Sequence, residues 1–235
     1  MNYEEWISLR YLTAKKEPFL AIINFVAVAG VAIGVAALII VIAVMTGFDN
    51  DLRDKIIGTN AHIVVEKEIG LNNFRTVQKM IMGVPGVKAT APYVQGPLFV
   101  EYDGQSKGVM ARGIDPKAEP GVTKAKEYLK QGRLESLDGN GVIIGSELAS
   151  FLGKHLGDPI TLISPASGLS GGGWRRELKV VGIFTSGMYD YDMNLLFIHL
   201  AKAQEIFQLP ENTVNGIAVK IGNVYDAPKI KKMLL

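Results

Sequence analysis

The feature that most constrains this chain is a run of 31 consecutive residues without a charged side chain, from Pro18 to Phe48. Roughly 20 apolar residues are enough to cross a bilayer as a helix. Asn24 and Thr46 are the only clearly polar members of the run. A cleaved signal peptide has a shorter apolar core, of about 7–15 residues, and ends at small residues. The run therefore predicts an uncleaved transmembrane helix over residues 18–48.

The residues before this run have the pattern of a helix lying on a membrane surface. Tyr3, Trp6, Ile7 and Tyr11 recur at helical spacing, and aromatic residues next to a span are typical of the bilayer interface. We expect residues 1–17 to form a cytoplasmic interfacial helix. Lys and Arg are nearly balanced across the span, so charge favours a cytoplasmic N-terminus only weakly.

Small residues line one face of the predicted span. Ala27, Gly30, Gly34 and Ala37 share a helix face, and Gly30 with Gly34 forms a GxxxG pair that lets a second helix approach closely. Asn24 is expected to face the same protein interior rather than lipid. The face predicts packing against a partner helix, although small residues are common in any spanning helix.

Residues 49–235 predict an α+β domain, because segments of strand and helix periodicity alternate between turn signals. Asp103-Gly104 is a hairpin turn signal, and Ser146 is expected to cap the helix that follows it. We expect residues 49–96 and 200–235 to form one subdomain and residues 97–199 a second. The predicted strands cover 61–66, 87–94, 97–102, 107–113, 140–145, 160–164, 177–184, 194–199 and 216–221, and the helices 73–82, 146–152, 202–209 and 227–235.

Composition and motifs argue against several kinds of chemistry. The chain has no cysteine and a formal net charge of +2, so neither disulfides nor a basic nucleic-acid surface is expected. His62, His155 and His199 are far apart, without metal-ligand spacing. A phosphate-binding GxxxxGK[ST] motif is missing as well. We therefore expect no catalytic residues, no metal and no cofactor.

A glycine-rich segment looks suited to binding a partner. The predicted strands Ile160–Ser164 and Glu177–Phe184 flank Pro165–Gly173, which makes residues 160–184 a projecting hairpin. Exposed Trp and Arg residues supply much of the binding energy at protein interfaces. Trp174 and the two arginines after it can serve this purpose; alternatively, Trp174 folds back onto the sheet.

The order and spacing of several short motifs resemble one protein family. The chain is similar to the lipoprotein-releasing permeases of the LolC/LolE family, within the larger class of MacB-like ABC transporter permeases. The segments that carry this resemblance are Leu9–Tyr11, Val44–Phe48, Ala111–Pro116, Val142–Ala149, Gly157–Asp158, Ser164–Ser167 and Val180–Phe184.

The resemblance implies an inner-membrane transport subunit rather than an enzyme. Such permeases have one span, a periplasmic domain of two subdomains and three further spans, so we expect this chain to lack the last three. The implied partners are a cytoplasmic ABC ATPase, a second permease subunit of the same or a sister type, lipoprotein cargo, membrane lipid and a LolA-like periplasmic carrier. Two alternatives stay open: a MacB-like efflux or mechanotransmission permease, and a membrane-anchored periplasmic binding module.

The resemblance also assigns roles within the hairpin. It implies a hook that holds the carrier and a supporting pad beside it. The hook residues are Pro165, Ala166, Ser167, Gly168, Leu169 and Trp174, and the pad residues are Arg175 and Arg176.

Overall fold

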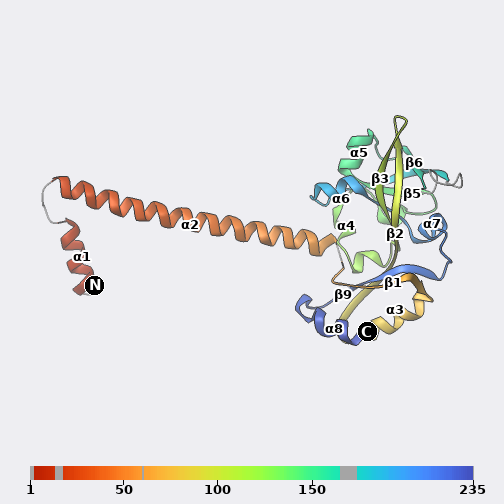
Figure 1. The fold of residues 1–235 in the computed structure, drawn as a ribbon, viewed down its shortest axis with the longest axis horizontal. Coiled ribbons are helices and arrows are strands. Elements are labelled where there is room, and N and C mark those ends of the chain that lie inside the picture. The colour runs from red at the N-terminus through yellow and green to blue at the C-terminus, as the bar shows by residue number, and fades with distance from the viewer. Residues whose placement is uncertain (1–2, 14–17, 60, 165–173, 235) are drawn as a thin grey trace. The chain divides into compact units, whose positions relative to one another are not determined.

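The computed structural model describes residues 3–13, 18–59, 61–164 and 174–234. They divide into two compact units, residues 1–53 and residues 54–235 (Figure 1). Each unit is described by itself.

The N-terminal unit is helical. Helix α1 covers Tyr3–Thr13, and α2 begins at Pro18, as expected for a proline in a first helical turn. Within α2, the 28 residues Ile22–Asp49 form a segment that is long and apolar enough to cross a membrane. No residue in the most apolar stretch of this segment is buried. This confirms the predicted apolar helix. The helix is longer than predicted, because α2 continues without a break to Thr59.

The second unit contains nine strands among the described residues, joined in one sheet. The strand order is β1-β9-β2-β3-β8-β5-β7-β4, and β6 pairs with both β2 and β7. The strands β2, β3, β8, β5, β7 and β6 therefore form a closed ring, which is a small barrel (Figure 1). The strands are β1 (Ile63–Asn72), β2 (Val87–Tyr102), β3 (Gln105–Ile114), β4 (Leu129–Gly132), β5 (Gly141–Gly145), β6 (Pro159–Ile163), β7 (Arg175–Phe184), β8 (Leu195–His199) and β9 (Thr213–Ile221).

The long strand β2 replaces two predicted strands. It pairs with β9 up to Tyr93 and with β6 from Phe99, so one edge is unpaired between these residues. The backbone N–H of Gln95 points to that edge, where it donates to Asn215 Oδ1 at 2.8 Å. Pro97 faces the same edge, because alternate residues of a strand point their N–H groups the same way. Its missing N–H breaks no ladder bond, so the strand continues through the proline.

This change of partner bears on the predicted subdomains. The boundary expected at residue 96 lies between Tyr93 and Phe99, where β2 leaves β9 and joins β6. The main hydrophobic core nevertheless includes buried residues on both sides of that boundary, such as Val219 and Leu162. The architecture is a mixed α/β domain, and the division into two subdomains stays a prediction.

Short helices cover the sheet and barrel. α5 begins at Ser146, but the expected Ser146 cap is wrong: Gly145 occupies the N-cap position and no side-chain cap bond forms. Ser146 lies inside the helix, where its carbonyl accepts the Ser150 hydroxyl at 2.9 Å. The sequence predicts neither α4 nor α6. The helices are α3 (Phe74–Met82), α4 (Ala125–Tyr128), α5 (Ser146–Leu152), α6 (Tyr189–Asn194), α7 (Leu200–Ile206) and α8 (Ala227–Leu234), with 3-10 turns η1 (Glu119–Gly121), η2 (Leu134–Ser136) and η4 (Val224–Asp226).

Candidate functional site

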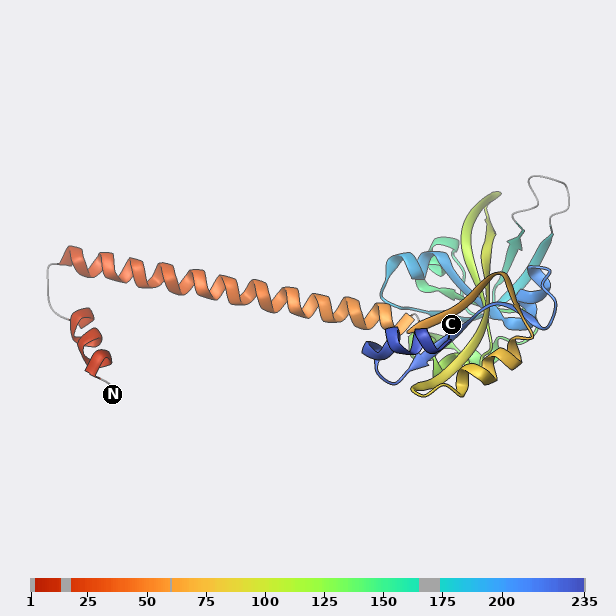
Figure 2. The ribbon, with the colours of Figure 1, turned by 60° about the horizontal axis from the view of Figure 1, so that its bottom comes forward.

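The base of the predicted hook is a well-paired β-hairpin. Strands β6 and β7, drawn in teal in Figure 2, are antiparallel, with Ile163 opposite Arg175. The backbone N–H of Ser164 donates to the Trp174 carbonyl at 3.1 Å, so the pairing reaches the last described residue on each side. The predicted pairing of these strands is confirmed. The expected hook residues Pro165, Ala166, Ser167, Gly168 and Leu169 lie outside the described residues.

Trp174 lies at the base of the hairpin instead of its tip. Its side chain is partly buried and packs against the main core. Along β7, Leu178 and Val180 are buried at the alternate positions that continue from Trp174. The structure therefore favours the second alternative for this residue, in which the indole folds back onto the sheet.

The two pad arginines join the hairpin to two different elements. Arg175 forms an ion pair with Glu101 on β2. Arg176 lies 3.0 Å from Oε1 of Glu205 on α7, and Lys202 lies 2.9 Å from Oε2 of the same carboxylate. The hydrogen bond from Lys202 is the main cause that holds the pKa of the Glu205 carboxyl below its usual range. The arginine side chains remain 64% and 50% exposed, so each can also meet a partner.

The predicted packing face lies on α2. Asn24, Ala27, Gly30, Gly34 and Ala37 are all exposed, but so are nearly all described residues of the apolar part of α2, so exposure does not single out this face. A Cβ atom added at Gly30 or Gly34 would meet nothing within 4 Å among the described residues. Packing against a partner helix stays a prediction.

The sequence reasoning missed a buried polar cluster beside the barrel. Glu119 is 1% exposed, and one of its oxygens accepts the Thr123 hydroxyl at 3.0 Å. The same oxygen lies 3.9 Å from Nη2 of Arg112, whose guanidinium stacks over the Tyr93 ring at 4.6 Å. Burial raises the pKa of the Glu119 carboxyl, and the positive charge of Arg112 opposes this shift. The sequence offers one indication of this cluster, which is Arg112, a charged residue within a predicted strand.

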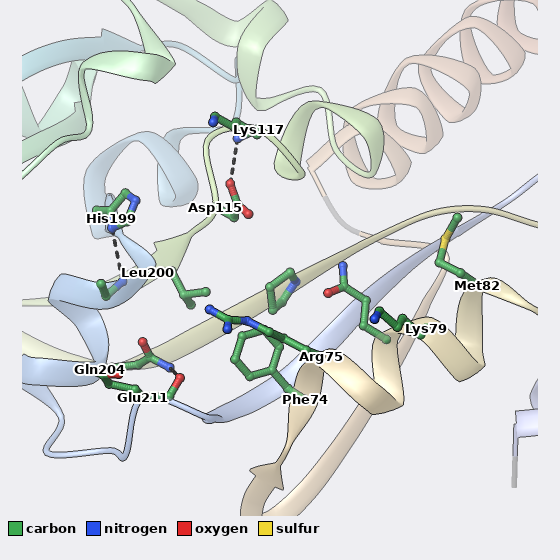
Figure 3. A pocket seen from close by; sticks show the side chains of 13 residues that line it. Phe74, Arg75, Lys79, Met82, Asp115, Lys117, His199, Leu200, Gln204 and Glu211 are labelled. Carbon is green, nitrogen blue, oxygen red and sulfur yellow. Dashed lines mark hydrogen bonds between the residues drawn. The ribbon is translucent and has the colours of Figure 1, made fainter.

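A groove of about 700 Å³ lies elsewhere in the domain, between α3 and α7 (Figure 3). Phe74, Arg75 and Lys79 line it from α3, and Leu200 and Gln204 from α7. No group of three or more potential metal ligands occurs in the described part of the chain. Sequence reasoning missed this groove, because its walls come from distant parts of the chain.

Comparison with known proteins places this geometry in a family. The MacB-like periplasmic core domain family matches residues 24–234. The chain is 32% identical over 245 residues to the lipoprotein-releasing system transmembrane protein LolC of Neisseria meningitidis serogroup B, covering 100% of this chain and 58% of that protein. It is 28% identical over 246 residues to the corresponding LolE protein of Haemophilus influenzae, covering 100% of this chain and 59% of that protein.

A solved structure agrees with the fold. The periplasmic region of MacB from Actinobacillus actinomycetemcomitans has a TM-score of 0.51 and 16% identity, covering 76% of this chain and 82% of that one. The LolC and LolE relatives are longer than this chain, which spans less than two thirds of their length. The chain belongs to the MacB-like periplasmic core domain family, as a member with an N-terminal apolar helix, and all of it is similar to part of the LolC and LolE transmembrane proteins.

Proposed function

We propose that this chain is the N-terminal part of a permease subunit of an ABC transporter that releases lipoproteins from the inner membrane. The observation that carries the proposal is the similarity to LolC, which extends over the whole chain and includes both the apolar helix and the domain. In this proposal residues 18–48 span the inner membrane, the N-terminus is cytoplasmic and the domain is periplasmic.

The physical task explains why several partners are needed. A lipoprotein anchor loses about 0.8 kcal/mol of favourable burial for each CH₂ group that leaves the bilayer. Extraction of whole acyl chains is therefore strongly uphill unless it is coupled to ATP hydrolysis and to a protein that shields the chains. We assign the first role to a cytoplasmic ATPase and the second to a LolA-like periplasmic carrier.

The α2 face offers a contact for a second permease subunit. Gly30 and Gly34 leave the backbone open on one side, so a second helix can approach closely there. Asn24 lies near the same face and gains from a polar partner within a helix bundle. The partner helix can come from an identical or a sister subunit.

The hairpin of β6 and β7 is the proposed carrier-binding site. Beside the loop, β6 pairs with β7 on one edge and, at Leu162 and Ile163, with β2 on the other, so β6 anchors the loop to the barrel. β7 gains its second partner, β5, only from Lys179 onward. Pro165–Gly173 is the proposed hook, and Arg175 and Arg176 remain accessible beside it.

The test is deletion of Ser167–Gly173 in the full permease complex, with binding of the purified carrier as the measurement. We expect carrier binding to be lost while membrane insertion and assembly persist. Tyr225→Ala is a suitable control, because this side chain is 83% exposed on another element, η4. Undiminished carrier binding by the deletion variant would refute the hook.

A MacB-like efflux or mechanotransmission permease is the second candidate, favoured by the fold similarity to the MacB periplasmic region. Fold alone does not determine function. Normal lipoprotein release from membranes that lack the full-length protein would favour this alternative.

A further inference from the structure

The groove between α3 and α7 has the size and walls of a preformed binding site. Its volume of about 700 Å³ is within the range of typical ligand sites. Phe74 and Leu200 form an apolar floor, with exposures of 5% and 9%. Little of either side chain is left for a ligand to cover, so this floor shapes the groove more than it adds hydrophobic binding energy.

Hydrogen bonds inside the domain hold the polar walls in place. Gln204 Nε2 donates to the carbonyls of Glu211 and Thr213 at 2.8 and 2.9 Å. On the opposite wall, Gln78 Nε2 donates to the Thr90 carbonyl at 3.2 Å. Both amides are therefore oriented before any ligand arrives.

The charges of the groove favour a negative ligand. Arg75 and Lys79 on α3 and Lys117 on the opposite side have no carboxylate within ion-pair distance among the described residues. In Figure 3 the Arg75 guanidinium points from α3 toward Leu200. Charged residues in an interface favour a partner of complementary charge.

Two carboxylates and a histidine complete the polar lining. Asp115 accepts the backbone N–H of Lys117 at 2.9 Å through one of its two oxygens. His199 Nδ1 accepts the backbone N–H of Ala201 at 3.2 Å, so a neutral imidazole carries its proton on Nε2 and can donate. Glu211 is the other acidic residue of the lining. Three cations and this donor therefore outweigh the two carboxylates.

We propose that this groove docks an acidic, partly apolar peptide segment of a partner protein. The cations are spread over two walls, and the floor between them is apolar, which fits an extended segment whose carboxylates alternate with apolar side chains. Met82 at one end of the groove is 46% exposed and can adapt its flexible side chain to such a segment. A phosphate group would fill only part of this space. The proposal is independent of the carrier hook.

The test uses the full chain in nanodiscs and a short fluorescein-labelled peptide of alternating Glu and Leu, with fluorescence anisotropy as the measurement. We expect the peptide to bind more weakly as the salt concentration is raised, because Arg75, Lys79 and Lys117 are exposed and salt screens their charges. Combining Arg75→Glu with Lys79→Glu should weaken binding by roughly tenfold or more. The matched control combines Lys229→Glu with Lys231→Glu on α8, which changes the net charge equally and should leave binding intact.

Three results would overturn the proposal: failure of the acidic peptide to bind, equal losses in the groove and α8 variants, or displacement of the peptide by an equal concentration of inorganic phosphate. An alternating Lys and Leu peptide should not bind; if it binds equally well, the charge argument is wrong. Deletion of Ser167–Gly173 should leave peptide binding unchanged, so failure of the hook and failure of this groove are distinguishable.

Discussion

Replacing Arg112 with Met tests how the domain tolerates its buried carboxylate. The guanidinium Nη2 lies 3.9 Å from Glu119 Oε1, and the two side chains are only 13% and 1% exposed. At that separation, with an effective dielectric constant of about 20, the Coulomb attraction is about 4 kcal/mol. Removing one partner of a buried pair typically costs about 3–5 kcal/mol, since the remaining charge is uncompensated. We expect Arg112→Met to lower the free energy of unfolding by about 3 kcal/mol or more near neutral pH.

The loss should depend on pH in a definite direction. Burial raises the pKa of the Glu119 carboxyl, and loss of the Arg112 charge raises it further. A carboxyl whose pKa is higher in the folded than in the unfolded protein contributes its full stability below the unfolded pKa. That contribution is lost as pH rises through the folded pKa. Arg112→Met should therefore destabilise the domain less in acid, where Glu119 is protonated, than at neutral pH.

Urea unfolding followed by Trp174 fluorescence measures this loss, because Trp174 is the only tryptophan in residues 54–235. A variant combining Arg112→Met with Glu119→Leu controls for the change in packing, and it should recover much of the stability. The reasoning fails if Arg112→Met costs less than about 1 kcal/mol at neutral pH, or if its cost is the same in acid.

Three further predictions concern packing. Gly145→Ala should prevent folding or lower the melting temperature sharply, because its Cβ would overlap the backbone carbonyl of Asp192; soluble yield and thermal melting report this. Leu162→Ala, at a fully buried position of β6, should cost about 2–5 kcal/mol in urea unfolding, whereas Thr161→Ala should cost under about 0.5 kcal/mol. Gly30→Leu should leave membrane insertion intact but reduce co-purification of the second permease subunit; undiminished co-purification would remove the packing role of that face.

The parts of the fold that the sequence predicts are those set by local chemistry. The uncharged run from Pro18 predicts α2, because few other structures accept so many apolar residues. Asp103-Gly104 predicts the β2–β3 hairpin, since both residues adopt positive φ angles of 47° and 75°, as the turn requires. The strands on both sides of the hook follow equally from their apolar alternation.

The remaining parts depend on contacts between distant segments. Pro97 predicts a break between two strands. Only the change of partner from β9 to β6 explains why β2 continues through this proline. The sequence predicts a surface position for Glu119 of η1, because no local pattern shows that it is buried beside Arg112 of β3. Closure of the barrel rests on two residue pairs, Phe99 with Ile163 and Val100 with Leu162, which no local pattern reveals.

The role of Arg175 is open to a charge-swap experiment, because its ion pair and its exposure suggest different functions. The guanidinium pairs with Glu101 on β2 but is 64% exposed, so it either positions the hairpin or contacts the carrier. An exposed pair contributes roughly 0–1 kcal/mol, so Arg175→Glu alone should leave the domain folded.

The two roles predict opposite results for the double variant that combines Arg175→Glu with Glu101→Arg. Because the swap restores the ion pair with reversed polarity, it should restore carrier affinity if Arg175 acts by positioning β7. If Arg175 contacts the carrier directly, affinity stays low, since a carboxylate now occupies the contact position. Carrier affinity of the single and double variants, measured beside their thermal melting, separates the two. Unchanged affinity in both variants would remove Arg175 from the proposed site, whatever the fate of the hook.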